Sequence, residues 1–158
     1  MTATSQAPLV TVRLVGLPLK VHARAQQHSA EMTREFQLIV EQDHQGGGSI
    51  PARLLQISTL LSGRYAGFTE EQEARIEAGI EAGETQLDEV TFLVPADVGD
   101  AARQLGDILD EAEDFCSSGQ LLTLSATPEV TAYRRWYLDN FIVQCAGAPP
   151  LPWTGPLV

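Results

Sequence analysis

Residues that could hold a metal ion are few in this chain and lie far apart along it. A di-iron or di-manganese bundle needs two Glu-x-x-His pairs on different helices and two further glutamates. Glu41 and His44 have that spacing, but neither of the other two histidines follows such a glutamate. Cys116 and Cys145 have no second cysteine or histidine nearby for a zinc site. We therefore expect neither a metal nor any other cofactor.

Motifs for nucleophilic catalysis and phosphate binding are missing as well. The chain has no Gly-x-Ser-x-Gly elbow, and Ser117 and Ser118 follow Cys116 at an expected helix end, where capping explains them. The glycines at 46–48 lack the Gly-Lys-Ser or Gly-Lys-Thr ending of a phosphate loop. We predict that the protein is not an enzyme.

The residues most typical of a binding surface lie near the end of the sequence. Arg134, Arg135 and Trp136 fall on an expected helix, and Trp153 lies in a proline-rich segment after it. Arginine and tryptophan are enriched in the hot spots of protein interfaces. Two interpretations stay open: an exposed patch that binds a partner, or a Trp136 packed in the core while the tail folds back and Trp153 covers a hydrophobic edge.

Negative charge is concentrated in one region. The whole chain carries −11, yet 70–114 alone holds 15 acids against two arginines, a balance of −13. Such a field repels nucleic acid and attracts a basic protein surface. The acids form either a solvated helical face or a partner-binding one. The candidates for partner contact lie on one expected helix: Asp107, Asp110, Glu111 and Asp114. A calcium loop is excluded because it needs a glycine turn, not a regular helix.

One stripe of the expected first helix could instead line a ligand site. His28, Met32 and Phe36 are four residues apart and share a helix face. Helical bundles often hold small molecules between facing helices. A partly buried core histidine explains His28 equally simply.

These residues must be positioned by helices and a few strands. Alternating apolar residues at 9–15 predict a half-buried strand, and a helical period follows from Leu19 to His44. Ser49 and Pro51 begin a second helix, and a turn is expected at 63–68. Thr69 and Gln72 have capping-box spacing at the start of a third helix, 70–83.

In the second half of the chain, expected strands and helices again follow one another. Residues 90–94 and 121–124 have strand character, and the clearest helical period lies between them, from Val98 to Cys116. Thr127 and Pro128 begin the last helix. We predict a mainly α protein, a bundle of four to five helices, with a two- or three-stranded sheet formed by 9–15, 90–94 and 121–124.

Length and composition favour one domain. At 158 residues and 44% hydrophobic content the chain can bury its own core. We expect a disordered start at 1–8, a helical domain at 9–147 and an extended proline-rich tail at 148–158. Neither a signal-peptide pattern nor an 18-residue apolar run is present, so we expect a cytoplasmic protein with reduced, buried cysteines.

Three runs, 17–36, 112–124 and 134–153, resemble a family of small, uncharacterised actinobacterial proteins. That family occurs beside anti-sigma-type kinases and STAS-domain antagonists, the components of partner-switching regulation. The resemblance implies a regulatory protein-binding module in such signalling. A small-molecule sensor is the alternative. The wide apolar faces of the first and last helices leave homodimerisation open.

Overall fold

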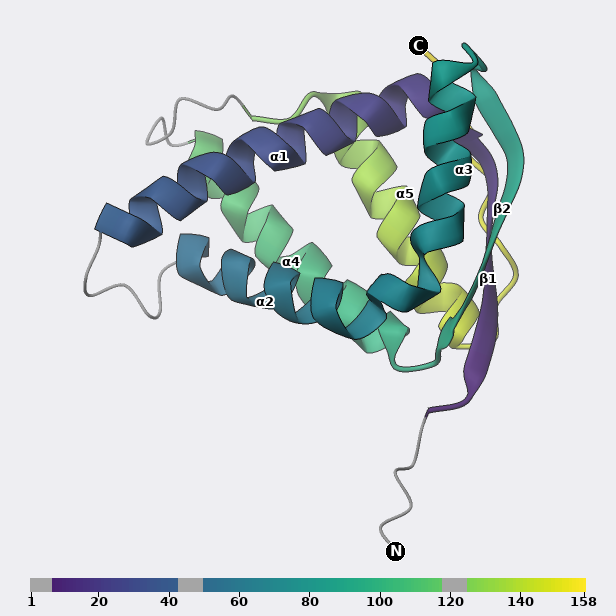
Figure 1. The fold of residues 1–158 in the computed structure, drawn as a ribbon, viewed down its shortest axis with the longest axis horizontal. Helices are drawn as coiled ribbons and strands as arrows, with labels where there is room; N and C mark the ends of the chain where they lie inside the picture. The colour runs from purple at the N-terminus through teal and green to yellow at the C-terminus, as the bar shows by residue number, and fades with distance from the viewer. Residues whose placement is uncertain (1–6, 43–49, 118–124) are drawn as a thin grey trace, which may run out of the picture.

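The computed structural model describes residues 7–42, 50–117 and 125–158 (Figure 1). They form five α-helices, one 3-10 helix and a two-stranded sheet, so the prediction of a mainly α fold with a small sheet is confirmed. The predicted strand at 121–124 lies outside the described residues. In chain order the elements are β1 (Leu9–Pro18), α1 (Leu19–Gln42), α2 (Ile50–Tyr65), η1 (Ala66–Phe68), α3 (Glu70–Glu81), β2 (Gln86–Pro95), α4 (Val98–Ser117) and α5 (Pro128–Cys145).

The sheet pairs β1 with β2 antiparallel, and its two faces differ as the alternating sequence predicts. Val12 lies opposite Phe92 and both are fully buried against the helices. The next residues point the other way, and on that exposed face Arg13 pairs with Glu89 at 3.4 Å. Because side chains alternate between faces along a strand, the register that pairs Val12 with Phe92 places both of these side chains on the inward face.

Polar groups from the helices and the tail cover both edges of the sheet. The Gln144 side chain of α5 accepts from Arg13 N at 2.9 Å and donates to Arg13 O at 2.9 Å. Further along β1, Trp153 N donates to Val15 O at 3.0 Å. On the outer edge of β2, Gln72 Nε2 donates to Thr91 O at 2.8 Å. These contacts satisfy backbone groups that would otherwise invite pairing with another chain.

Gly16 permits a close approach within β1. Its φ of 74° lies in the left-handed region, and an added Cβ would come within 2.9 Å of Gln86 Nε2. That same amide donates to Gly16 O at 2.9 Å. A side chain at this position would therefore strain the backbone and displace the Gln86 amide.

The core consists of two clusters of buried residues. The first joins the sheet to α5 and to the starts of α1 and α4, with Phe92 and Phe141 among its large side chains. The second joins the C-terminal halves of α1 and α4 to the N-terminal half of α2. Leu138 of α5 packs against both clusters. Figure 1 shows α1, α2 and α3 as the sides of an open frame, with α4 and α5 behind it.

The helix starts agree only in part with the sequence. At α5 the Thr127 hydroxyl accepts from Val130 N at 3.4 Å, with Pro128 next in the chain, as predicted. The predicted capping box of α3 is wrong, because Thr69 makes no side-chain cap and donates instead to Ala66 O at 3.3 Å. The expected turn at 63–68 is only partly correct, since α2 continues through Tyr65. No helix of the described residues is both long and apolar enough to cross a membrane.

Candidate functional site: a hollow at the centre of the frame

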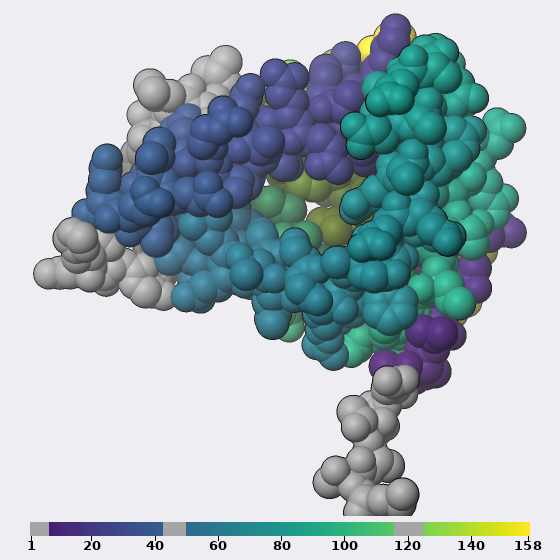
Figure 2. Space-filling view, in the orientation of Figure 1, coloured from purple at the N-terminus to yellow at the C-terminus, as the bar shows by residue number. Residues whose placement is uncertain are grey.

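The centre of the helical frame is hollow. Figure 2 shows the opening bordered by α1, α2 and α3, with side chains of α5 deep inside. The main cavity has a volume of about 500 Å³, which is within the range that small-molecule sites occupy. Its lining comes from α2, the segment between α2 and α3, α3 itself, β2, α4 and α5: Leu61, Ser62, Tyr65, Ala66, Thr69, Glu70, Glu73, Val94, Val98, Ala101, Ala102, Leu105, Tyr137, Leu138 and Phe141.

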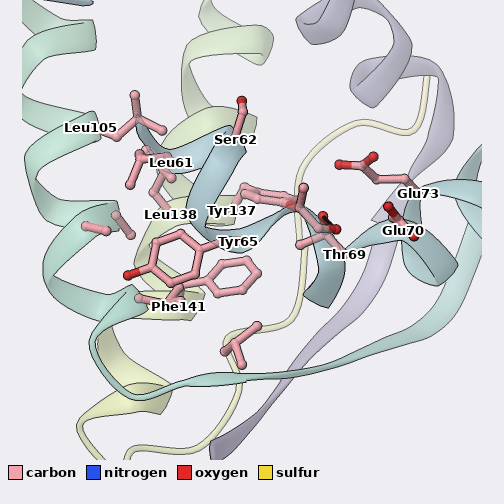
Figure 3. A pocket seen from close by; sticks show the side chains of 15 residues that line it. Leu61, Ser62, Tyr65, Thr69, Glu70, Glu73, Leu105, Tyr137, Leu138 and Phe141 are labelled. Carbon is pink, nitrogen blue, oxygen red and sulfur yellow. Dashed lines mark hydrogen bonds between the residues drawn. The ribbon is translucent and has the colours of Figure 1, made fainter. Parts of the chain in front are cut away.

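Aromatic and aliphatic side chains form most of its wall. The rings of Tyr137 and Phe141 lie one turn apart on α5, with centroids 5.3 Å apart. Tyr65 comes from the end of α2, and its hydroxyl donates to Asp97 Oδ1 at 3.0 Å. In Figure 3 the rings of Tyr65 and Phe141 gather on one side with Leu138. This wall suits an apolar ligand body, because burying apolar surface is the main favourable term.

The Tyr137 hydroxyl is the unusual polar group of the cavity. It makes no hydrogen bond with any residue in the described part of the chain. Figure 3 shows it on the side of the cavity where Thr69, Glu70 and Glu73 lie. Burial raises the pKa of Tyr137 above its ordinary value, and the Glu73 charge raises it further. The Tyr137 side chain is only half-buried and its hydroxyl faces the open hollow, so this protonated donor is available to a ligand or water.

Carboxylates mark the mouth of the cavity. Glu70 and Glu73 are exposed residues on the first turn of α3. Neither carboxylate forms an ion pair with a described residue. Among the described residues, no lysine, arginine or histidine lines this cavity. The opening therefore carries two carboxylates, offset only in part by the N-terminal end of α3, next to an apolar interior.

A second cavity of about 210 Å³ adjoins the first. The two share Leu105, Tyr137 and Leu138 as lining residues. The second cavity lies between α1, α4 and α5, and its other lining residues are His22, Ala25, Gln26, Ser29, Leu109, Val130, Tyr133 and Arg134. The hollow thus reaches from the α3 side of the frame to the α1 side.

His22 gives the second cavity a neutral polar wall. Burial lowers the pKa of His22 to about 4, and burial raises the pKa of Tyr133 above its ordinary value. Both groups are therefore uncharged near neutral pH. Gln26 Nε2 lies 3.4 Å from His22 Nε2 and can only donate, so Nε2 is the acceptor of the neutral ring. The imidazole proton then resides on Nδ1, which donates to the Tyr133 hydroxyl oxygen.

The stripe that suggested a ligand site from sequence lies away from this hollow. Met32 and Phe36 are buried in the second core cluster among α2 and α4 residues, and Phe36 packs edge-on against Phe115 with centroids 5.9 Å apart. His28 instead faces α4, with Nε2 3.6 Å from Glu113 Oε1. None of the three predicted lining residues lines the central cavities, because neighbouring helices fill the space beside them.

Arg134 lies inside the molecule, although the sequence suggested it for an exposed patch. Only 11% of its side chain is exposed, and Nη1 lies 3.4 Å from Glu113 Oε1. Glu113 Oε2 also accepts from Ala126 N at 3.0 Å. Together with His28, these groups join α1, α4 and the start of α5 in one polar cluster. The carboxylate of Glu113 partly neutralises the buried Arg134, whose Nη2 has no hydrogen-bond partner among the described residues.

The two tryptophans meet within one chain. Trp136 and Trp153 are half-buried and pack edge-on with centroids 5.4 Å apart. The Trp136 indole donates to Leu151 O. Residues 148–158 therefore fold back over α5 and β1, which agrees with the second interpretation for the tail, whereas Trp136 packs at the edge of the core instead of inside it. Arg135 alone of this group is well exposed, 66% of its side chain, and lies 3.8 Å from Asp110.

All four acids proposed for partner contact are exposed on α4. Asp110 pairs with Arg135, and Glu111 pairs with Arg53 at 2.9 Å. Asp107 and Asp114 form no ion pair with the described residues. These four residues form the outer acidic face of α4, which points away from the hollow.

Metal-binding side chains do not gather within residues 7–42, 50–117 and 125–158, where no three His, Cys, Asp or Glu groups come together. Cys145 is a free, half-buried thiol whose pKa is raised mainly by burial. It packs against Gly99, where an added Cβ would lie 3.0 Å from Cys145 Cβ. The side chain of Cys116 lies outside the description.

Comparison with known proteins identified no relative of this chain. Neither the protein-family models, the curated proteins nor the solved structures gave a match. The resemblance to the actinobacterial partner-switching proteins stays a prediction. The function is therefore argued from the geometry of the hollow.

The sequence concealed the hollow because its lining is dispersed over six parts of the chain. Tyr137 and Phe141 read as members of the apolar face of the last helix, and Glu70 as a helix-start acid. Two signals were present: tyrosines on a buried face, whose hydroxyls need partners, and the few apolar residues of α3, which leave one side of the frame thinly covered.

Proposed function

We propose that this protein is a non-enzymatic, ligand-sensing module that holds a small molecule with an apolar body in the central hollow. The observation that supports this most is the cavity of about 500 Å³ between α2, α3, α4 and α5. Small-molecule sites are typically concave, mostly apolar hollows of this volume with a few polar groups. A space this large, with aromatic walls and an unpartnered hydroxyl, fits a binding site better than a packing defect.

A non-enzymatic role fits the groups that face the cavity. The Tyr137 hydroxyl has a raised pKa and keeps its proton, and the adjoining His22 is neutral and bonded to Tyr133. The lining of the main cavity provides carboxylates and hydroxyls but neither a thiol nor a histidine. These groups can bind and orient a ligand, whereas they do not form a nucleophile–base pair.

Binding of a neutral fluorescent probe, N-phenyl-1-naphthylamine, tests the proposal. Ala101 is a small lining residue of α4, so Ala101→Phe should fill the cavity and weaken probe binding by about tenfold or more. Ala132→Phe is the control, because it adds the same ring to an exposed site on α5 that lines neither central cavity. Saturable binding of one probe per chain, lost only in Ala101→Phe, supports the site. Equal binding by both variants rejects it.

A second function is favoured by the outer acidic face of α4: docking of a basic protein surface. Asp107 and Asp114 are exposed and unpaired among the described residues. With the resemblance to partner-switching proteins, this suggests cytoplasmic regulation through a protein partner and disfavours nucleic acid. Pull-down from a native extract at low and high salt tests it. Capture of a specific basic protein that is lost in Asp107→Asn with Asp114→Asn supports docking, and unchanged capture by that variant rejects it.

A further inference from the structure

The electrostatics of the hollow indicate what class of ligand it takes. The exposed residues that line the main cavity are Ser62, Ala66, Glu70 and Glu73, and only the two glutamates among them are charged. No described basic side chain lines this cavity or pairs with either acid. An anionic headgroup at the mouth would be repelled by the two carboxylates, whereas a cation would be attracted to them.

The groups behind the mouth add a second reason to expect a cation. The rings of Tyr65, Tyr137 and Phe141 lie along one wall, and π faces attract ammonium groups. The Tyr137 hydroxyl, which has no partner among the described residues, presents its oxygen near Glu73. A hydroxyl oxygen and two carboxylates can together accept from or solvate a positively charged head.

From this arrangement we propose that the ligand is an organic cation, an amine or quaternary ammonium on an apolar body, with its positive head between Glu70 and Glu73 and its body along Tyr137 and Phe141. The inference rests on the proposed function, since it needs the cavity to be a binding site. It adds the sign of the ligand's charge and its orientation in the hollow.

The opposite orientation is disfavoured by the inner end of the hollow. There His22 is neutral, and the Arg134 guanidinium lies beside Glu113. An inserted cationic head would meet Arg134, whereas an apolar chain would contact Ala25, Leu109 and Val130. The head therefore belongs at the α3 mouth.

Three molecules with the same ten-carbon chain test the sign of the charge: decyltrimethylammonium, decanol and decanoate. Each displaces N-phenyl-1-naphthylamine from the wild-type protein at neutral pH. We expect decyltrimethylammonium to bind about fivefold more tightly than decanol, and decanoate to bind most weakly, since a solvent-accessible ion pair contributes up to about 1 kcal/mol. Added salt should reduce the preference for the cation and leave decanol unchanged.

Two substitutions locate the effect. Glu73→Gln should remove most of the preference for decyltrimethylammonium over decanol while the affinity for decanol stays constant. Glu77→Gln is the matched control, because Glu77 lies on the same helix, is exposed and does not line the cavity. Loss of the preference in Glu73→Gln alone supports the inference. An unchanged preference in Glu73→Gln, or an equal loss in both variants, overturns it.

The outcomes separate this inference from the proposed function. If decanol and decyltrimethylammonium bind equally, and Ala101→Phe blocks both, the cavity is a ligand site but its preference for a cation is refuted. If decanoate binds most tightly, the inference is likewise refuted and Arg134 becomes the group to test. If Ala101→Phe leaves all three affinities unchanged, the proposed function itself fails.

Discussion

Helix α5 contributes to two regions of the molecule that differ in hydrogen bonding: in one the polar side chains have partners, and in the other a hydroxyl lacks one. Toward the sheet, Asn140 and Gln144 use their side-chain amides fully: Asn140 Oδ1 accepts from Gln144 Nε2 at 2.9 Å and from Leu151 N at 3.0 Å. Toward the centre, Tyr137 on the same helix has a hydroxyl without a partner in the described residues.

This difference separates structure from function. A buried amide network in which every member is bonded stabilises one arrangement, because each broken bond exposes an unsatisfied group. A hydroxyl left open beside a cavity contributes little to that stability, and its role has to be sought in what enters the cavity. We interpret the sheet end as the structural scaffold and the hollow as the ligand-binding part.

The largest effect should come from the scaffold core. Phe92 is fully buried and contacts the rings of Tyr137 and Phe141, with centroids 6.5 and 5.2 Å away. Phe92→Ala should lower the free energy of unfolding by about 4 kcal/mol, because it removes a large side chain from the packed cluster. Urea denaturation measures this. A loss no larger than that of an exposed substitution such as Leu93→Ala would show that the sheet end is not the scaffold.

The next largest effect should depend on pH, through His22. In the folded state the pKa of His22 is about 4, whereas in the unfolded chain it is about 6.5. Between these values the unfolded state binds a proton that the folded state does not, so stability falls as pH decreases from 6.5 to 4. The loss reaches about 3 kcal/mol. His22→Gln should flatten this part of the stability curve measured by urea denaturation. An unchanged slope would contradict the neutral, buried state of His22.

The amide network should contribute somewhat less. Asn140→Ala removes three hydrogen bonds, one to Gln144 and two to the Leu151 backbone, while Gln144 keeps its bonds to Arg13. We expect a loss of about 2 kcal/mol. The tail should detach at the same time, so Trp153 fluorescence should shift to longer wavelength well below the unfolding transition. If Asn140→Ala leaves both properties as they are, the network is not what holds the tail.

A matched pair of tyrosine substitutions gives the smallest effect and the sharpest contrast. Tyr133→Phe removes the hydrogen-bond partner of His22 Nδ1 and should cost about 1 kcal/mol. Tyr137→Phe removes a hydroxyl without a described partner and should change stability by less than about 0.5 kcal/mol. Thermal unfolding of the two variants in parallel checks this. Equal losses would erase the proposed difference between the two regions.

The fold could be predicted further from the sequence than the site could. The alternation at 9–15, the β-branched and aromatic residues at 90–94 and the helical periods of α1 and α4 are local patterns, as are Thr127 and Pro128 at the start of α5. They identify their elements without knowledge of the neighbours. The prediction of a capping box at Thr69 was wrong because Gln72, the other residue of the motif, donates to Thr91 O of β2 instead. That contact joins residues far apart in the chain, and no local spacing encodes it.

The hollow could not be predicted because it is a property of how helices are spaced. The stripe with Met32 and Phe36 has the same pattern as a ligand-lining face, yet α2 and α4 fill the space beside it. Tyr137 and Leu138 look like ordinary core residues, yet a cavity lies beside them. An apolar face is identified by periodicity, whereas the distance to the opposite wall depends on the tertiary packing.

A crystal structure of the protein with bound N-phenyl-1-naphthylamine would test the central claim most directly. The account predicts one probe molecule in the central hollow, in contact with Tyr137, Phe141 and Ala101. A hollow filled by rearranged side chains, with the probe on the outer surface, would contradict it.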